Sequence, residues 1–282
     1  MNEKIDNELN QNKISVNLKT DEVVIPKDKI VTVYYTPRFL QITDIKNQSD
    51  IPYKKINNQV FLNVETGELK QGIKNSENAR SISSLRKTFS RISLLIKSNF
   101  NGDKSECFIS LSYNRKVSDN KELNRDIKNL YAKLTRNTDV PYRCLVVLEY
   151  QGNGNVHIHI LVKRLDNECL YINELEKNSL WENGTCDIQR LYDSDGLADY
   201  LNPFKISHKR KRLKYYKQNM QIYRCYGHFD RPQKDRITLE EALNLVKVNN
   251  LKTHNSISYD IVNDKNVVNT ITKFIYKGDK KL

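Results

Sequence analysis

Apolar residues recur at two different spacings along this chain, and each spacing predicts a type of element. From Cys107 to Tyr113 apolar and polar positions alternate, and Val156 to Lys163 alternates in the same way, as in half-buried strands. From Ser76 to Lys97 apolar residues recur every three or four positions, which predicts a helix with one apolar stripe and a largely basic remainder. Asp119 and Glu122 form a capping pair that predicts the start of a second helix.

The central elements follow one another in the order strand, helix, strand, strand. The strands at Arg143 to Tyr150 and Val156 to Lys163 flank Gln151 to Asn155, whose Gly and Asn residues suit a hairpin loop. A short strand over Thr185 to Arg190 comes next, followed by a brief helix that we expect Ser194 to cap. This pattern predicts an α+β fold in which a central antiparallel sheet of about five strands is flanked by helices.

The flanking regions carry weaker patterns. Lys29 to Ile42 is β-branched and aromatic but contains Pro37, so we expect one or two short strands near a sheet edge. Leu62 to Gly72 has turn-like polarity, and Ile172 to Leu180 fits a short helix. A helix and two strands are expected near the carboxyl terminus, at Leu239 to Val248, Ser256 to Val262 and Val267 to Tyr276.

The charge of the chain points to a polyanionic partner. The 282 residues include 47 Lys or Arg and 34 Asp or Glu, which gives a net charge of +13. Lys205 to Arg236 contains eleven of the basic residues and only two Asp, and tyrosines are interleaved with them. This mixture suits contact with phosphates together with stacking on bases.

Other functional classes are disfavoured by the sequence. The longest apolar runs, such as Ile92 to Ile96, are far shorter than the roughly 20 residues that cross a bilayer, so we expect no membrane contact. Met1 to Asn12 is polar and acidic, unlike a secretory signal, which favours a cytoplasmic location. The five cysteines are odd in number and never spaced C-x-x-C, so we interpret them as reduced packing residues.

Two histidines and one glutamate are expected on a single face of the sheet. Strand alternation sends His157 and His159 to the face opposite Val156 and Ile158. If the hairpin closes symmetrically, Glu149 lies directly opposite His157. Two imidazoles and a carboxylate form a three-ligand set with open positions, which suits Mn²⁺, with Mg²⁺ as the alternative. The competing interpretation is an ion pair of Glu149 with a nearby arginine, either Arg143 or Arg164, beside two merely exposed histidines.

From Cys107 to Pro232 the chain resembles the HUH-type rolling-circle replication initiators of plasmids, phages and mobile elements. Three features carry the resemblance: the Ser-rich strand Phe108 to Ser112, the His157-Ile158-His159 triplet preceded by Glu149, and Trp181-Glu182-Asn183-Gly184 followed by a helix with Tyr200. The resemblance implies an RRM-like or ferredoxin-like core. With it, the expected segments are a flexible arm over 1–28, strands and a basic helix over 29–106, the endonuclease core over 107–204, and a basic aromatic extension packed on the core over 205–282.

The resemblance also implies a chemistry. In this family a cation held by the residues matching Glu149, His157 and His159 assists attack by a tyrosine, here Tyr200, on single-stranded DNA. The product would be a 5′-phosphotyrosine and a free 3′-hydroxyl, so that the enzyme can nick and rejoin DNA without ATP. The expected DNA contacts are all basic or aromatic residues of the extension: Lys205, Lys209, Arg210, Lys211, Arg212, Lys214, Tyr223 and Arg224.

One departure from the family pattern leaves the nucleophile open. Relatives often place a lysine three positions after the tyrosine, whereas this chain has Pro203 there. Either another lysine such as Lys205 supplies that function, or a different tyrosine is the nucleophile. The alternatives are Tyr192 first and then Tyr215 or Tyr216.

The expected partners are single-stranded or hairpin origin DNA and, in a bacterial cytoplasm, a host helicase with the replication machinery. Two other functions stay open at this stage. One is a catalytically silent DNA-binding regulator of replication or transcription on the same scaffold. The other is an RNA-binding sheet, which is disfavoured because the expected face carries histidines and Glu149 in place of stacking aromatics.

Overall fold

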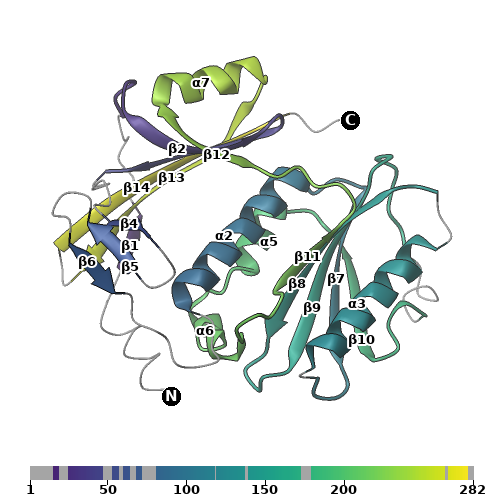
Figure 1. Cartoon of the computed structure of the whole chain (residues 1–282). Coiled ribbons are helices and arrows are strands. Elements are labelled where there is room, and N and C mark those ends of the chain that lie inside the picture. Colours follow the sequence, from purple (N-terminus) through teal and green to yellow (C-terminus); the bar gives the residue numbers. More distant parts are fainter. Residues whose placement is uncertain are drawn as a thin grey trace. The chain divides into compact units, whose positions relative to one another are not determined.

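The computed structural model describes residues 15–18, 25–46, 53–56, 60–63, 68–71, 81–117, 119–136, 139–172, 179–263 and 266–278. These residues belong to two units (Figure 1). The central unit consists of Asn78–Pro232, and the terminal unit combines Met1–Glu77 with Gln233–Lys281.

The central unit is built on a five-stranded sheet in the order β10-β7-β9-β8-β11, in which every neighbouring pair is antiparallel. Its strands are β7 (Glu106–Tyr113), β8 (Tyr142–Tyr150), β9 (Val156–Arg164), β10 (Gly184–Arg190) and β11 (Tyr223–Tyr226). The α+β class and the antiparallel sheet expected from the sequence are therefore confirmed. Strand alternation produces two chemically different faces, one almost wholly apolar and one that carries the two histidines.

Helices cover both faces of this sheet (Figure 1). The helices are α2 (Ile82–Asn99), α3 (Asn120–Thr135), α5 (Ser194–Tyr200), the short α6 (Ser207–Arg210) and the 3₁₀ turn η1 (Leu213–Tyr215). α3 packs on the apolar face, where Tyr113 of β7 donates a hydrogen bond to Asp126 at 3.0 Å. α2 and α5 lie on the histidine face (Figure 1), and α2 buries its predicted apolar stripe of Leu85, Phe89, Ile92 and Ile96.

The local signals set the helix starts. Asp119 caps α3 by accepting a hydrogen bond from the main chain of Lys121, as expected. α5 differs by one residue, because its cap is Asp193 and not Ser194. The carboxylate of Asp193 accepts hydrogen bonds from the main chain of Asp195 and Gly196, whereas Ser194 is already helical. In the possible helix over 172–180, residues 173–178 lie outside the described residues.

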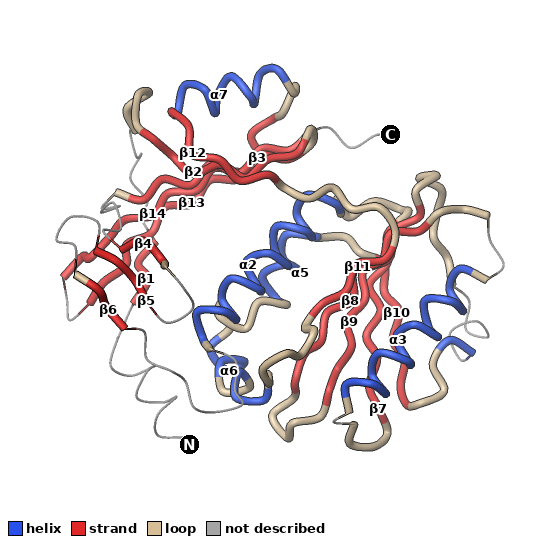
Figure 2. The backbone as a smooth tube through the Cα atoms, viewed as in Figure 1, coloured by secondary structure: helices blue, strands red, loops and turns tan. Residues whose placement is uncertain are grey.

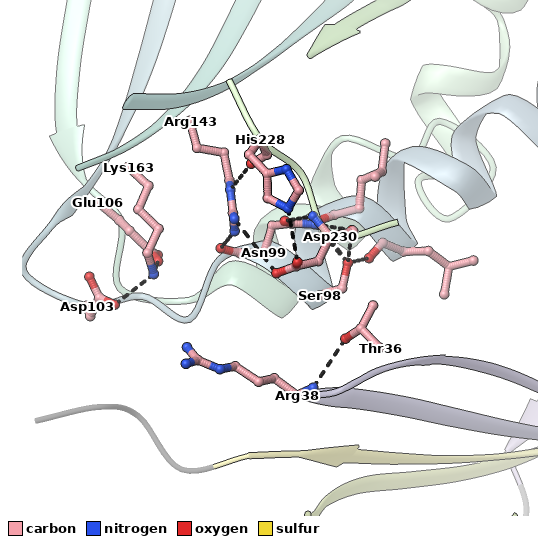
Figure 3. Close-up of polar contacts among 12 residues, drawn as sticks. Thr36, Arg38, Ser98, Asn99, Asp103, Glu106, Arg143, Lys163, His228 and Asp230 are labelled. Atoms are coloured by element: carbon pink, nitrogen blue, oxygen red, sulfur yellow. Dashed lines mark hydrogen bonds and ion pairs between the residues drawn. The ribbon is translucent and has the colours of Figure 1, made fainter. Parts of the chain in front are cut away.

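A polar cluster ties the segment after β11 to the end of α2 (Figure 3). The side chain of Asn99 donates to the main-chain oxygen of Asp230 and accepts from its main-chain nitrogen, both at 2.9 Å. Arg143 of β8 donates to the main-chain oxygen of His228 at 2.6 Å. Residues 228–230 are thereby fixed against the carboxyl-terminal turn of α2.

The terminal unit contains a six-stranded antiparallel sheet in the order β1-β13-β14-β3-β2-β12 (Figure 2). Its elements are β1 (Ser15–Leu18), β2 (Ile30–Thr36), β3 (Phe39–Ile45), β12 (Gln233–Thr238), α7 (Leu239–Val248), β13 (Lys252–Asn263) and β14 (Asn266–Lys277). A small sheet of β4 (Tyr53–Lys55), β5 (Val60–Asn63) and β6 (Leu69–Gln71) accompanies it. α7 starts with a capping box between Thr238 and Glu241 and packs Ala242 on Val31, Val33 and other core residues.

Several expectations for this unit are wrong. β2 and β3 are interior strands, because Pro37 lies in the turn between them and interrupts no hydrogen-bond ladder. Part of the turn-like stretch over 62–72 is paired in β5 and β6. The chain also divides at other places than the sequence suggested, since 233–277 joins the strands of 29–45 whereas 205–232 stays with the core. Of the expected arm over 1–28, residues 1–14 and 19–24 lie outside the described residues, and β1 pairs with β13.

Candidate active site

The site begins with the register of three neighbouring strands. Glu149 of β8 lies directly opposite His157 of β9, as the symmetric hairpin predicted. On the other side of β9, Ser112 of β7 pairs with His157 and Ser110 pairs with His159. Because directly paired residues share a face, all five polar side chains lie on the same side of the sheet.

Glu149 is the electrostatic centre of this face. Its Oε2 accepts hydrogen bonds from His159 Nε2 and Lys209 Nζ, both at 3.0 Å, and its Oε1 accepts one from Arg212 at 2.7 Å. Burial alone would raise the pKa of Glu149, but the hydrogen bond from His159 and the charge of Lys209 outweigh it and lower that pKa to about 2. The interpretation of Glu149 as the partner of a nearby arginine on the sheet is wrong, since Arg143 pairs with Asp230 and Arg164 with Asp166.

Both histidines are held by serine hydroxyls. His159 is buried, stacks on Phe108 with ring centroids 5.3 Å apart, and has its Nδ1 3.0 Å from Ser110 Oγ. A neutral His159 that donates from Nε2 to Glu149 accepts the Ser110 hydroxyl at Nδ1. His157 Nε2 lies 2.9 Å from Ser112 Oγ and also contacts the amide of Gln151. Burial and the neighbouring His159 lower the pKa of His157, which favours its neutral form.

The donor set fits a divalent cation in type and in protonation state. An ionised carboxylate and neutral imidazoles are the forms in which these residues bind metals. Among the described residues, however, no group of three His, Cys, Asp or Glu side chains converges as a ready-made cage. Glu149 and His159 meet, whereas His157 turns its Nε2 to Ser112 and Gln151. The ammonium of Lys209 occupies the carboxylate at the position where a metal ion would compete.

Tyr200 stands at the edge of the same group. It is the last residue of α5, is 47 % exposed, and has its ring centroid 6.3 Å from that of His159. The Lys209 ammonium lies 3.4 Å from the centroid of the Tyr200 ring and donates to the Tyr200 carbonyl oxygen at 2.8 Å. Burial and the carboxylate of Glu149 raise the pKa of the Tyr200 phenol. Glu149, His157, Tyr200 and Arg212 all line one cavity of about 510 Å³.

The alternative tyrosines are placed less favourably. Tyr192 follows β10 beyond Arg190, which pairs with Cys107, five residues of β7 from the Ser112 level of His157. At about 3.3 Å per residue this offset is about 16 Å along the sheet. Tyr216 is buried and donates to the carbonyl of Leu148, and burial raises its pKa far above the usual value. Tyr215 donates to the carbonyl of Gly152 at 2.9 Å.

The Trp-x-x-Gly element fixes the strand behind His157. The indole of Trp181 donates to the carbonyl oxygen of Ser112 at 2.9 Å, and its side chain is buried against Tyr113. A Cβ on Gly184 would lie 2.1 Å from the same carbonyl oxygen, so only glycine permits this close approach. Both residues therefore hold the segment of β7 whose Ser112 hydroxyl contacts His157.

Residues 106–204 match the family model of the replication-associated protein ORF2. The matched segment runs from the start of β7 to just beyond α5, and it includes Glu149, both histidines, Tyr200 and the Trp-x-x-Gly element. No curated protein matches the chain. The match supports a replication-associated protein with DNA as its partner, and none of the described helices has the length and apolar character that a bilayer crossing requires.

The basic residues expected to contact DNA are divided among several environments, and all of them lie beyond the matched segment. Lys209 is 3 % exposed and Arg224 is 8 % exposed, so the expectation of exposed DNA contacts is wrong for both. Lys205, the expected substitute for the missing lysine, pairs with Asp199 at 2.7 Å, and Lys209 takes the position beside Tyr200. The remaining candidates are exposed or half-buried: Arg210, Lys211, Arg212, Lys214 and Tyr223.

Sequence reasoning missed the supporting residues of the site. Ser110 and Ser112 alternate along β7, which signals a shared face, but the register of β7 on β9 has no sequence signal. Gln151 lies in the predicted hairpin loop, next to β8. Lys209 follows Glu149 by 60 residues, and no spacing connects the two.

Proposed function

We propose that this protein is a rolling-circle replication initiator that nicks and rejoins single-stranded DNA through Tyr200. The observation that carries the proposal is the placement of a half-exposed phenol beside His159 and Glu149, in a cavity that Arg212 also lines. The match to a replication-associated family over 106–204 supports DNA as the substrate.

The covalent step follows from the position of the phenol. Tyr200 Oη attacks the phosphorus of the scissile phosphodiester, the P–O3′ bond breaks, the phenolic proton is lost, and the released 3′ oxygen takes up a proton. The product is a 5′-phosphotyrosine that retains the energy of the bond, so the reverse reaction rejoins the strand without a nucleotide cofactor. Because its pKa is raised, Tyr200 is a protonated phenol in the resting protein and needs stabilisation as it loses its proton.

Two cations of this chain are placed to supply that stabilisation. Lys209 lies against the Tyr200 ring and fixes the end of α5 through the Tyr200 carbonyl, so it orients the phenol. Arg212 projects into the cavity from the opposite side of Glu149, where its guanidinium can hold a phosphate oxygen. Lys209 therefore takes the position that Pro203 leaves vacant in the family pattern.

A divalent cation, Mn²⁺ or Mg²⁺, held by Glu149, His157 and His159 would polarise a non-bridging phosphate oxygen and offset the charge that develops on it. The serines beneath the histidines prepare the site for this, because Ser110 and Ser112 fix the two imidazole rings. Origin DNA, single-stranded or in a hairpin, a host helicase with the replication machinery, and a bacterial cytoplasm complete the proposal.

The test is a covalent adduct on a denaturing gel. The full chain is incubated with Mn²⁺ and a random-sequence single-stranded DNA labelled at its 3′ end, since the phosphotyrosine retains the 3′-side fragment. Wild type and Tyr192→Phe should form the adduct, Tyr200→Phe should not, and chelation should prevent it. An adduct in Tyr200→Phe that maps to Tyr192 would reassign the nucleophile. Full activity of the His157→Ala/His159→Ala double variant would refute the metal role.

One observation favours a second candidate function, a catalytically silent DNA-binding regulator. Lys209 and Arg212 already neutralise Glu149, and His157 is turned away from it. A regulator would bind DNA in the same experiment but form no adduct at any Mn²⁺ or Mg²⁺ concentration.

A further inference from the structure

A second basic groove lies in the central unit, separate from the cavity at Tyr200. It has a volume of about 560 Å³ and lies between α2 and β11, the edge strand of the five-stranded sheet. Lys87, Arg91, Arg224 and Arg231 line it, and none of the described residues that line it is acidic. The groove is therefore complementary to a polyanion.

The wall formed by α2 is a regular stripe. Ser84, Lys87, Thr88 and Arg91 follow one another at positions i, i+3, i+4 and i+7, which places them on one side of the helix. Lys87 and Arg91 are exposed, and neither forms an ion pair with any residue that the structure describes. Their charge is thus available to a ligand.

The opposite wall is formed by β11 and the segment that follows it. The main chain of Asp230 is bonded in both directions to Asn99 at the end of α2 (Figure 3), which holds the neighbouring Arg231 at the groove. Arg231 is exposed and has no ion-pair partner among the described residues. The half-buried Tyr223 adds an aromatic ring to this wall, beside the apolar Ile222.

The groove lies close to the site across the sheet. Tyr223 pairs with Val147, and Val147 pairs with His159, so the three residues share a face and a level of the sheet. Two strand spacings separate Tyr223 from His159, which is about 10 Å. The chain that links the two places, from Arg212 to Met220, contributes to both linings.

We infer that the groove between α2 and β11 binds single-stranded DNA that flanks the scissile phosphate. Lys87, Arg91 and Arg231 contact successive phosphates, and Tyr223 stacks on a base. The exposed face of an unpaired base favours a single strand over a duplex, in which the base faces are covered. The inference rests on the proposed function, because it assumes that the strand in the groove is the one that Tyr200 attacks.

The test measures binding of a fluorescent single-stranded oligonucleotide of mixed sequence to the full chain by anisotropy, in a chelating buffer that prevents chemistry. The test variant is Lys87→Gln/Arg91→Gln/Arg231→Gln. The matched control, Lys121→Gln/Lys128→Gln/Arg136→Gln, removes the same charge from exposed residues on and directly after α3, on the other side of the sheet. A charge-keeping variant, Lys87→Arg/Arg91→Lys/Arg231→Lys, separates lost charge from lost folding.

Three lost phosphate contacts should lower the slope of log affinity against log salt by about 2. Between about 50 and about 200 mM salt, the affinity of the test variant should therefore fall about 18-fold less than that of wild type. The control and the charge-keeping variant should keep the wild-type slope. If wild type binds and the test variant behaves like the control, or if only duplex binding loses slope, the inference is overturned while the proposed function stands. If wild type binds no single-stranded DNA, both fail.

Discussion

Lys209→Met separates the two functions that Lys209 has been assigned, an exposed DNA contact from the sequence and a positioning residue for Tyr200 from the structure. Methionine keeps most of the apolar stem and removes the ammonium. In the structure that ammonium donates to Glu149 at 3.0 Å and to the Tyr200 carbonyl at 2.8 Å, and the side chain is 3 % exposed. The substitution therefore changes the interior of the site and leaves the exposed surface intact.

The effect on stability should be moderate. Glu149 keeps Arg212 and His159 after the substitution, so the loss stays below the about 3–5 kcal/mol expected when a buried charge is left without a partner. The two lost hydrogen bonds are partly offset by the removal of a desolvated charge, which leaves a destabilisation of about 1–2 kcal/mol. For a unit of this size, the melting temperature should fall by about 2–8 °C.

The effect on the reaction should be larger. A cation–π contact in a desolvated setting is worth about 2 kcal/mol. If that interaction supports the phenol of Tyr200 during attack, the rate of adduct formation at saturating DNA should fall about 30-fold. Binding to single-stranded DNA in a chelating buffer should keep its affinity and salt slope. The exposed neighbour Lys211→Met serves as the control for the adduct rate, which it should leave unchanged.

The opposite pattern would refute this reasoning. If Lys209→Met formed the adduct at the wild-type rate but lost about 0.7 in salt slope, the residue would be a phosphate contact, as the sequence suggested. The loss of one phosphate contact with an unchanged rate is incompatible with a lysine that lies inside the site.

Three further predictions concern the supports of the site. The pKa of Glu149 is about 2 in the folded protein against 4.5 when unperturbed, so its ionised form stabilises the fold above pH 4.5 and that contribution, up to about 3 kcal/mol, is lost as the pH falls through 2; chemical denaturation should show a weaker decline below pH 4.5 for Glu149→Gln than for wild type. Gly184→Ala should lower the melting temperature by overpacking against Ser112, at a cost of about 1–3 kcal/mol, whereas Gly152→Ala, whose Cβ meets open space, should not; equal melting of the two would contradict the close approach. Cys169 should react with a maleimide in the native protein while Cys144 and Cys107, whose pKa burial raises to about 12, stay protected, and mass spectrometry of the labelled peptides would reveal the reverse.

The part of the site that depends on short-range patterns was predictable. Alternation placed His157 and His159 on one face, and the length of the Gln151–Asn155 loop set Glu149 opposite His157, as the ladder confirms. A hairpin fixes its own register, because the two strands are joined by a few residues. The same argument predicted the central antiparallel sheet and the apolar stripe of α2.

The contacts that depend on long-range packing were not predictable. The register of β7 on β9 determines that Ser110 and Ser112 support the histidines, and it is set by the tertiary packing of strands that are far apart in sequence. The sheet position of β2 and β3 was misjudged for a related reason. Pro37 disfavours a central strand only if it lies within the ladder, and the sequence alone does not show that it lies in the turn.

The basic stretch after Lys205 illustrates how charge and location differ. Its net charge correctly indicated a polyanionic partner, but net charge carries no information on which side chains reach solvent. Lys209 and Arg212 are engaged by Glu149, Lys205 is paired with Asp199, and Arg224 is buried against Asn124. The exposed and unpaired cations of the groove come mostly from α2, whose basic face the sequence offered only as a solvated surface. A DNA path across this protein should therefore be sought between α2 and β11, and the stretch with the highest charge density serves in part to hold the carboxylate and the phenol of the site together.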